Sequence, residues 1–166
     1  MVKSTQYKKW LRDSLDPNPL YGFELAQSTD LILLARENDF FLDGCQIIRK
    51  CDVDKAVRTA STRHCFRILK AEGLVDSLQI PAVNLSSWKT VFRSLGLGTT
   101  VWVENEKTGD FTIGPILRIN AKSVRADYFD GAGTFSGPQT FRFEAITTIQ
   151  FGTRYLELHT KHLKTR

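Results

Sequence analysis

Short segments of alternating apolar and polar residues, separated by turn residues, fill the stretch from Phe111 to Leu163 and constrain the fold most. In Ile113–Ile119, apolar side chains fall on one face with the period of two that is typical of a half-buried strand. Asp130–Gly133 contains two glycines, which destabilise a strand, so we expect a loop there. From Arg154 the apolar residues follow the spacing of a helix. The stretch therefore predicts antiparallel strands followed by a helix.

Similar segments occur through the rest of the chain. In the first half, strand-forming residues are concentrated in Phe23–Ala26, Leu31–Ala35, Phe40–Leu42, Gln46–Arg49 and Val53–Val57. In the second half, we expect strands at Thr100–Glu104, Ile113–Ile119, Val124–Tyr128, Thr140–Phe143 and Ile146–Phe151. The chain is thus expected to be mainly β, with a few helices in an α+β arrangement.

Three helices besides the C-terminal one are indicated by capping residues and periodicity. Residues 4–15 place Tyr7, Trp10, Leu11 and Leu15 on one helical stripe, and the prolines that follow would end the helix. A second helix begins after Ser61 and ends at Gly73. A third, capped by Ser86 or Ser87, ends at Gly96.

The two halves of the chain repeat each other weakly. Gly22 corresponds to Gly114 at an offset of 92 residues. The other matches are Phe41–Gly44 with Thr134–Gly137, Ile47–Arg49 with Thr140–Arg142, Val53 with Ile146, and Thr62–His64 with Thr153–Tyr155. We therefore divide the chain into an N-terminal helix and proline turn (1–19), a first repeat (20–74), a connector with a short helix (75–98), and a second repeat with a C-terminal helix (99–166).

Short, bent strands favour small closed barrels, because closure removes the unpaired edges of a sheet. The order of elements resembles the Sm-like and SH3-like barrels. The segments Ile80–Leu97 and Ile146–Leu163 are similar to those of an uncharacterised bacterial family of tandem barrels of this kind. The resemblance implies two small Sm-like or SH3-like barrels in tandem, each closed by a helix. Since Sm-like barrels associate through edge strands and a tandem copy satisfies some edges internally, we expect a monomer or a homodimer.

The resemblance does not extend to the motifs with which Sm proteins bind RNA. Those proteins carry an Asp followed closely by an Asn, and later an Arg-Gly or Lys-Gly pair. This chain has Asp127–Asp130 and Gln150–Gly152 at the corresponding places, without either motif. RNA binding is therefore not implied by the resemblance.

The composition, with 42% hydrophobic and 25% charged residues, is that of an ordinary globular protein. No apolar run approaches the roughly 20 residues that span a bilayer, and the first ten residues lack the apolar core of a secretory signal. Three cysteines at irregular spacing indicate reduced thiols and a cytoplasmic location.

The net charge of +5 is concentrated at the two ends of the chain. Residues 1–12 contain four basic and no acidic side chains, and residues 158–166 contain three basic and no acidic ones, so the remainder has a charge of −2. A surface that follows phosphates usually has a basic stripe on the folded domain itself. The pattern therefore favours a neutral body with basic ends.

Catalytic and metal-binding constellations do not stand out in the sequence. Cys51, His64 and Cys65 lack paired metal-ligand spacing, and His159 and His162 are explained as surface residues of a helix. We expect no enzymatic activity and no cofactor. The preferred function is protein interaction or scaffolding, and the alternative is RNA or DNA binding through the basic ends. The candidate binding residues are Lys8, Lys9, Arg12, Arg63, Arg154, Tyr155 and Lys161.

Overall fold

The structure is a computed structural model that describes residues 6–163. Along these residues the strands and helices follow in this order: β1 (Tyr7–Arg12), β2 (Asp16–Gln27), β3 (Leu31–Asn38), β4 (Phe41–Arg49), the 3₁₀ helix η1 (Lys50–Asp52), β5 (Lys55–Val57), α1 (Ala60–Ala71), α2 (Trp88–Leu95), β6 (Thr100–Asn105), β7 (Asp110–Ile119), β8 (Ser123–Phe129), β9 (Phe135–Arg142), the 3₁₀ helix η2 (Phe143–Ala145), β10 (Thr148–Phe151) and α3 (Arg154–Lys161).

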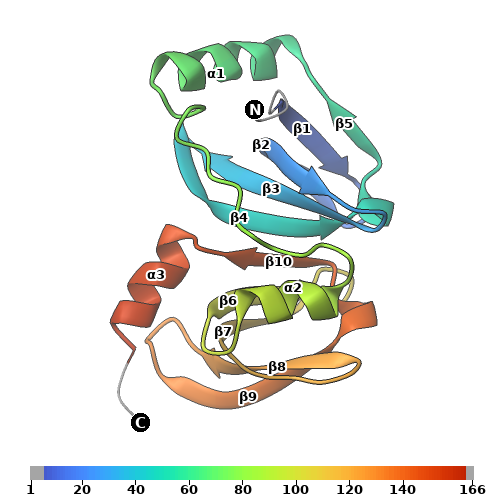
Figure 1. The fold of residues 1–166 in the computed structure, drawn as a ribbon, viewed down its shortest axis with the longest axis vertical. Coiled ribbons are helices and arrows are strands. Elements are labelled where there is room, and N and C mark those ends of the chain that lie inside the picture. Colours follow the sequence, from blue (N-terminus) through green and yellow to red (C-terminus); the bar gives the residue numbers. More distant parts are fainter. Residues whose placement is uncertain (1–5, 164–166) are drawn as a thin grey trace.

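The strands form one antiparallel sheet in the order β5-β1-β2-β3-β4-β10-β6-β7-β8-β9. In Figure 1 residues 7–57 supply the upper half and residues 100–151 the lower half, with β4 and β10 side by side where the halves meet. The expectation of two small barrels, each closed by a helix, is therefore wrong. Because β10 pairs with β4 as well as with β6, the two halves share a continuous open sheet. Among residues 6–163, its unpaired edges are the outer strands β5 and β9.

The halves nevertheless contain the same order of elements. Each has four strands, a 3₁₀ helix, a short strand that pairs with the first strand of its half, and an α-helix. Gly22 on β2 and Gly114 on β7 are equivalent, as the repeat predicted. A Cβ atom would lie 2.3 Å from the Ala35 carbonyl oxygen at the first position and 1.8 Å from that of Asp127 at the second. Both glycines permit a close approach of neighbouring strands.

The positions of the two 3₁₀ helices agree with the predicted match of Ile47–Arg49 with Thr140–Arg142. Arg49 directly precedes η1 and Arg142 directly precedes η2. Each arginine forms an ion pair with an acid in the following turn, at 2.5 Å to Asp52 and 2.9 Å to Glu144. The match of Thr62 with Thr153 is wrong by three residues. Thr59 caps α1 as Thr153 caps α3, whereas Thr62 occupies the third position within its helix.

The helix predicted for residues 4–15 is wrong for its described part, which contains the strand β1; residues 4 and 5 lie outside the described residues. Tyr7 and Trp10 have helical spacing, but they point to opposite faces of this strand. Tyr7 packs with Phe23 and Leu69, while Trp10 packs with Ile32. Pairing with β2 and β5, and burial on both faces, override the helical pattern.

The sequence suggested separate strands at Phe40–Leu42 and Gln46–Arg49. Apart from Phe40, which lies in the preceding turn, both segments belong to the single strand β4. Gly44 lies between them with a φ of 66°, and a Cβ atom there would lie 2.5 Å from the main chain of Gly152. Glycine therefore keeps the strand continuous at a point where β4 and the end of β10 approach closely.

The predicted helices at the end of the first repeat and in the connector are confirmed, although the first begins at Ala60 with Thr59 as its cap instead of after Ser61. Their apolar faces cover the sheet. Ser87 caps α2, which packs Val91 and Phe92 into the main core. In the first half, Leu69 of α1 joins the cluster around Phe23, and in the second half Leu156 of α3 packs against Ile113. Within residues 6–163, none of the helices has the length and apolar character required to cross a bilayer.

Candidate functional site

Arg12, one of the predicted binding residues, is buried in an ion pair that stabilises the fold. Its side chain is 2% exposed and donates hydrogen bonds of 2.8 and 2.6 Å to the two carboxylate oxygens of Glu106, in the other half of the chain. Two parallel hydrogen bonds between a guanidinium and a carboxylate fix both groups firmly. Arg12 therefore joins the halves and is not accessible to a ligand on the outer surface.

Of the two lysines of β1, Lys8 is engaged by other side chains. The Lys8 ammonium lies 2.7 Å from the Glu24 carboxylate and 5.3 Å from the centre of the Trp10 ring. Lys9 is half-buried on the same strand. Lys3, Lys164 and Arg166, which contributed to the charge of the ends, lie outside the described residues.

The remaining predicted residues lie on two helices in different halves of the molecule (Figure 1). Arg63 is exposed on α1, where it donates a hydrogen bond to the Arg58 carbonyl. Arg154, Tyr155 and Lys161 belong to α3, and the Tyr155 ring packs 4.3 Å from that of His159. The structure does not bring the predicted residues together into one surface.

A different feature of the structure is the pairing of β10, from the second half, with β4 of the first half. Four residues of β10 pair with β4, with Thr148 opposite Ile48 and Phe151 opposite Cys45. In this way an extended segment from the second half adds a strand to the outer side of β4. The first half thus shows which edge of its sheet accepts another strand.

In the second half the strand equivalent to β4 is β9, and no strand within residues 6–163 pairs with its outer side. The Phe143 amide donates to the Lys122 carbonyl at 2.9 Å, next to the pair formed by Arg142 and Ser123. Because hydrogen-bonding directions alternate along an antiparallel strand, the main-chain groups of Thr140 and Arg142 point to the outer side. Pro138 has the same orientation, so its missing N–H does not interrupt pairing with β8.

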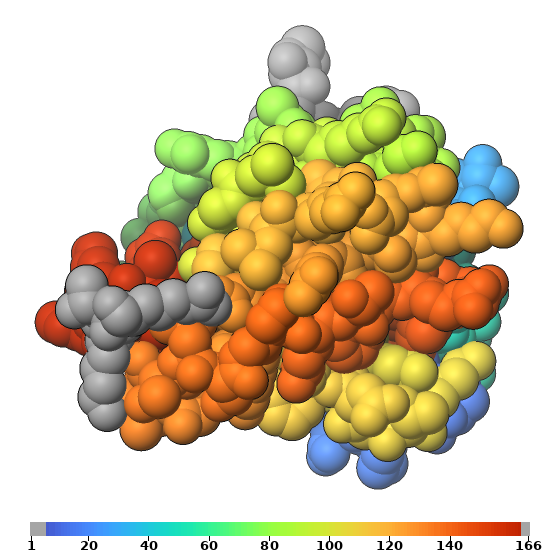
Figure 2. Space-filling model, turned by 90° about the horizontal axis from the view of Figure 1, so that it is seen from below, coloured from blue at the N-terminus to red at the C-terminus, as the bar shows by residue number. Residues whose placement is uncertain are grey.

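A groove of about 420 Å³ accompanies this edge. One wall is formed by β9 residues from Gln139 to Arg142, and the other by Asn105, Asp110 and Phe111 from the β6–β7 hairpin. The Phe111 ring is 42% exposed and gives the groove an apolar wall. Seen from below, β8 and β9 are coloured orange and lie at the surface of the molecule, and the β6–β7 hairpin is coloured yellow (Figure 2). The edge and its groove are accessible together.

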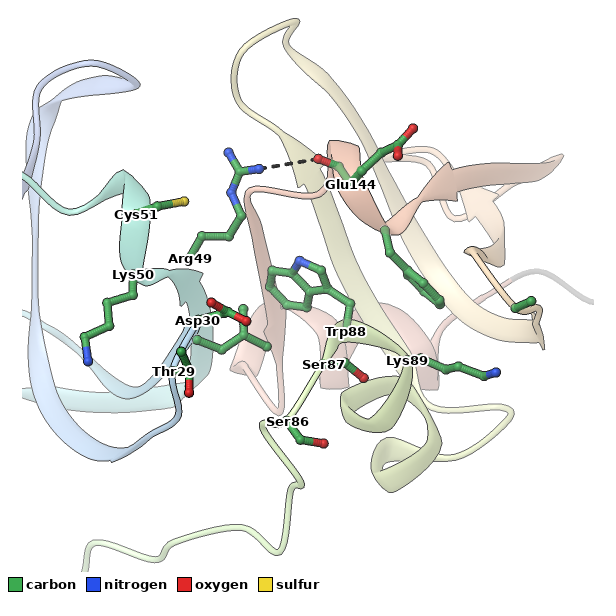
Figure 3. A pocket seen from close by; sticks show the side chains of 13 residues that line it. Thr29, Asp30, Arg49, Lys50, Cys51, Ser86, Ser87, Trp88, Lys89 and Glu144 are labelled. Carbon is green, nitrogen blue, oxygen red and sulfur yellow. Dashed lines mark hydrogen bonds between the residues drawn. The ribbon is translucent and has the colours of Figure 1, made fainter.

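A second cavity, of about 770 Å³, lies between the halves and is lined by η1, η2, the β2–β3 turn and the start of α2 (Figure 3). Arg49 crosses it and donates a hydrogen bond of 3.4 Å to the Glu144 carbonyl. Trp88 is 8% exposed and points into it, close to Asp30 in the view of Figure 3. The cavity follows from the pairing of β4 with β10, which brings η1 and η2 together.

The described residues offer little for metal or nucleophilic chemistry. Within residues 6–163, no three His, Cys, Asp or Glu side chains are grouped so that they could hold a metal ion. Burial raises the pKa of Cys45 to about 11, which disfavours the reactive thiolate.

The repeat predicted that Thr140–Arg142 corresponds to Ile47–Arg49, but it did not predict which of the two strands keeps a free edge. That distinction depends on β10, whose second partner lies about 100 residues away in the chain. Comparison with known proteins adds no further constraint, because no family model, curated protein or solved structure matches the chain.

Proposed function

We propose that this protein is a protein-interaction or scaffolding module that binds an extended segment of a partner along the outer edge of β9. One observation carries the proposal: β4, the equivalent strand of the first half, already has β10 paired along its outer edge. Each of these strands is followed directly by a 3₁₀ helix, β4 by η1 and β9 by η2. Among the described residues, the outer edge of β9 is open, whereas that of β4 is occupied by β10. Addition of a strand to a sheet edge is a common mode of peptide recognition.

Main-chain hydrogen bonds would supply part of the affinity. Thr140 and Arg142 each present an outward N–H and C=O, and each hydrogen bond formed contributes about 1 kcal/mol net. The groove beside the edge would supply selectivity. Phe111 favours an apolar side chain, while Asp110 and Arg142 favour polar groups of opposite charge at the two ends. The partner is therefore an extended peptide segment that alternates apolar and polar side chains.

Nucleic-acid binding through the basic ends has less support. Of its predicted residues, Arg12 is buried in an ion pair and Lys8 is paired with Glu24. The groove beside β9 has Asp110 as well as Arg142 among its lining residues, so it lacks the uniformly basic character of a phosphate-binding surface. We place the protein in the cytoplasm, where thiols remain reduced, because Cys45, Cys51 and Cys65 are unpaired.

Selection of peptides provides a direct test. A library of random 12-residue peptides is displayed on phage and selected against the full-length protein, and the selected peptides are titrated into ¹⁵N-labelled protein. The amide signals of Thr140 and Arg142 should shift, and their hydrogen exchange should slow. N-methylation of successive peptide amides should weaken binding with a period of two, because only alternate amides face the strand edge.

Thr140→Pro is the corresponding change in the protein, because it removes an amide N–H from the strand edge as N-methylation removes one from the peptide. It removes an outward N–H of an exposed residue without removing a hydrogen bond to β8, and it should reduce peptide affinity about tenfold, since part of the edge is lost. Ser136→Ala, an exposed change on the same strand that keeps the main chain intact, should have no effect. Binding that is indifferent to both N-methylation and Thr140→Pro would overturn the proposal.

A further inference from the structure

A polar cavity of about 330 Å³ lies where the two halves meet and is separate from the groove beside β9. Residues of β1, β2, β3 and β4 line it from the first half, and residues of β6 and β10 from the second. Its volume is at the small end of the range of about 300–1,000 Å³ that ligand sites occupy. The cavity therefore suits a small molecule.

The floor of the cavity is an unusually polar part of a sheet face. Gln46 on β4 lies directly opposite Gln150 on β10, and Thr148 lies directly opposite Glu104 on β6. Gln46 is 4% and Thr148 is 1% exposed, and the Gln46 amide donates a 2.9 Å hydrogen bond to the Thr148 hydroxyl. Burial of polar groups costs stability unless they are used in hydrogen bonds. Such a floor is fixed in position and suited to recognise polar groups.

Charged residues surround this floor. Arg12 and Glu106 neutralise each other in their ion pair. Arg36 and Glu104 remain, and neither belongs to an ion pair within residues 6–163. The Arg36 guanidinium donates to the Gln150 side-chain oxygen, which is its only hydrogen bond among the described residues. A basic and an acidic group thus line one cavity without satisfying each other.

The ionisation of both groups reflects this environment. Burial raises the pKa of Glu104, and the nearby Glu106 carboxylate raises it further. Burial also lowers the pKa of Arg36. The Asp43 carboxylate offsets part of this effect for Arg36, and the Arg12 guanidinium offsets part of it for Glu104, but burial outweighs both. A ligand of complementary charge would supply the compensation that remains.

We propose that this cavity binds a free amino acid with a basic side chain, whose carboxylate contacts Arg36 and whose α-ammonium contacts Glu104. The second cationic group of the ligand is inferred from Asp16. This residue lies at the half-exposed rim of the cavity, so the carboxylates outside the Arg12–Glu106 pair outnumber the guanidinium groups by one. The two glutamine amides supply further donors and acceptors at the floor.

Calorimetric titration of the full-length protein with four probes tests the proposal. L-Arginine or L-lysine should bind with a Kd below about 1 mM, which corresponds to about 4 kcal/mol. Agmatine and cadaverine, which lack the carboxylate, should bind at least about tenfold more weakly because a charge-assisted hydrogen bond to Arg36 is lost. Failure of all four probes to bind at about 10 mM would overturn the proposal.

Two variants identify the contacts. Arg36→Gln should remove the preference for L-arginine over agmatine, and an unchanged preference would contradict the assigned role of Arg36. Glu104→Gln should weaken L-arginine binding at least about tenfold while leaving the thermal unfolding midpoint equal or higher, so that unfolding cannot explain the loss. Glu157→Gln, a change of an exposed acid on α3, is the control and should leave affinity unchanged. Equal affinity in Glu104→Gln and Glu157→Gln would also overturn the proposal.

Discussion

Arg12 and Glu106 form a two-point ion pair across the boundary between the halves, with the arginine 2% and the glutamate 12% exposed. Arg12 comes from β1 and Glu106 follows β6, so the pair links the first strand of one half to that of the other. Thr147 adds a hydroxyl hydrogen bond of 2.8 Å to the same carboxylate. This contact supplements the pairing of β4 with β10.

Arg12→Ala should therefore destabilise the protein strongly. Loss of one partner of a buried ion pair leaves the other charge uncompensated and costs about 3–5 kcal/mol. Urea unfolding measures the change. Arg142→Ala is the control, because Arg142 and Glu144 form an exposed pair, 67% and 74% accessible, and its loss should cost less than about 1 kcal/mol. Equal effects of the two variants would contradict a joining role for Arg12.

Gly114→Ala should prevent or greatly weaken folding. The added Cβ atom would lie 1.8 Å from the Asp127 carbonyl oxygen, which is main chain and cannot move without disrupting β8. We expect a loss of about 3 kcal/mol or more, beyond the usual effect of overpacking. Thermal unfolding measures the change. Gly131→Ala, at a position with no atom within 4 Å of the added Cβ, should be nearly neutral in the same measurement. A stable, soluble Gly114→Ala variant would show that β7 and β8 do not approach so closely.

The three thiols should differ in reactivity. Burial raises the pKa of Cys45 to about 11 and also raises that of Cys65, whereas Cys51 is exposed on η1. Iodoacetamide at about pH 8 should therefore modify Cys51 at least about tenfold faster than Cys45. Mass spectrometry of tryptic peptides measures the rates, and denatured protein is the control in which the difference should vanish. Rapid modification of Cys45 in native protein would place it at the surface.

Glu104→Gln should also change the dependence of stability on pH. Since the pKa of Glu104 is raised in the folded state, the native protein binds more protons than the unfolded chain between the ordinary and the raised value. Stability is therefore lost as pH rises through that window. The glutamine variant lacks this loss, so its advantage in thermal unfolding should be present at about pH 7 and should shrink towards about pH 4. A difference that is independent of pH would contradict this explanation.

Local signals in the sequence predicted much of the fold. Ser87 and Gly96 delimit α2 as their capping chemistry suggests, and Gly22 and Gly114 mark equivalent close approaches of neighbouring strands. Local reasoning failed where partners distant in sequence decide the outcome. Tyr7 and Trp10 imitate a helical stripe because both faces of β1 are buried, and that depends on β2, β5 and α1.

The candidate sites were harder to predict than the fold. Arg12 was selected for its charge, but its burial depends on Glu106, 94 residues later. The polar cavity depends on Gln46 meeting Gln150, which requires β10 to pair outside its own half. Without that pairing, the sequence contains only dispersed glutamines, arginines and glutamates. Their grouping is a property of the sheet order and not of any local pattern.

The connector between α1 and α2, residues 72–87, contains neither helix nor strand. The strand pairs and the ion pair that unite the halves all involve residues outside it. A chain cut in this connector would keep both complementary surfaces, and the two fragments would reassemble as a bimolecular complex. The connector contributes packing, since Leu85 belongs to the main core and Leu74 packs beside Phe23, and it also contributes proximity, since a short tether holds its ends at an effective concentration on the order of 1 mM. Fragments produced separately would thus report, by their dissociation constant, how much of the stability belongs to the junction alone.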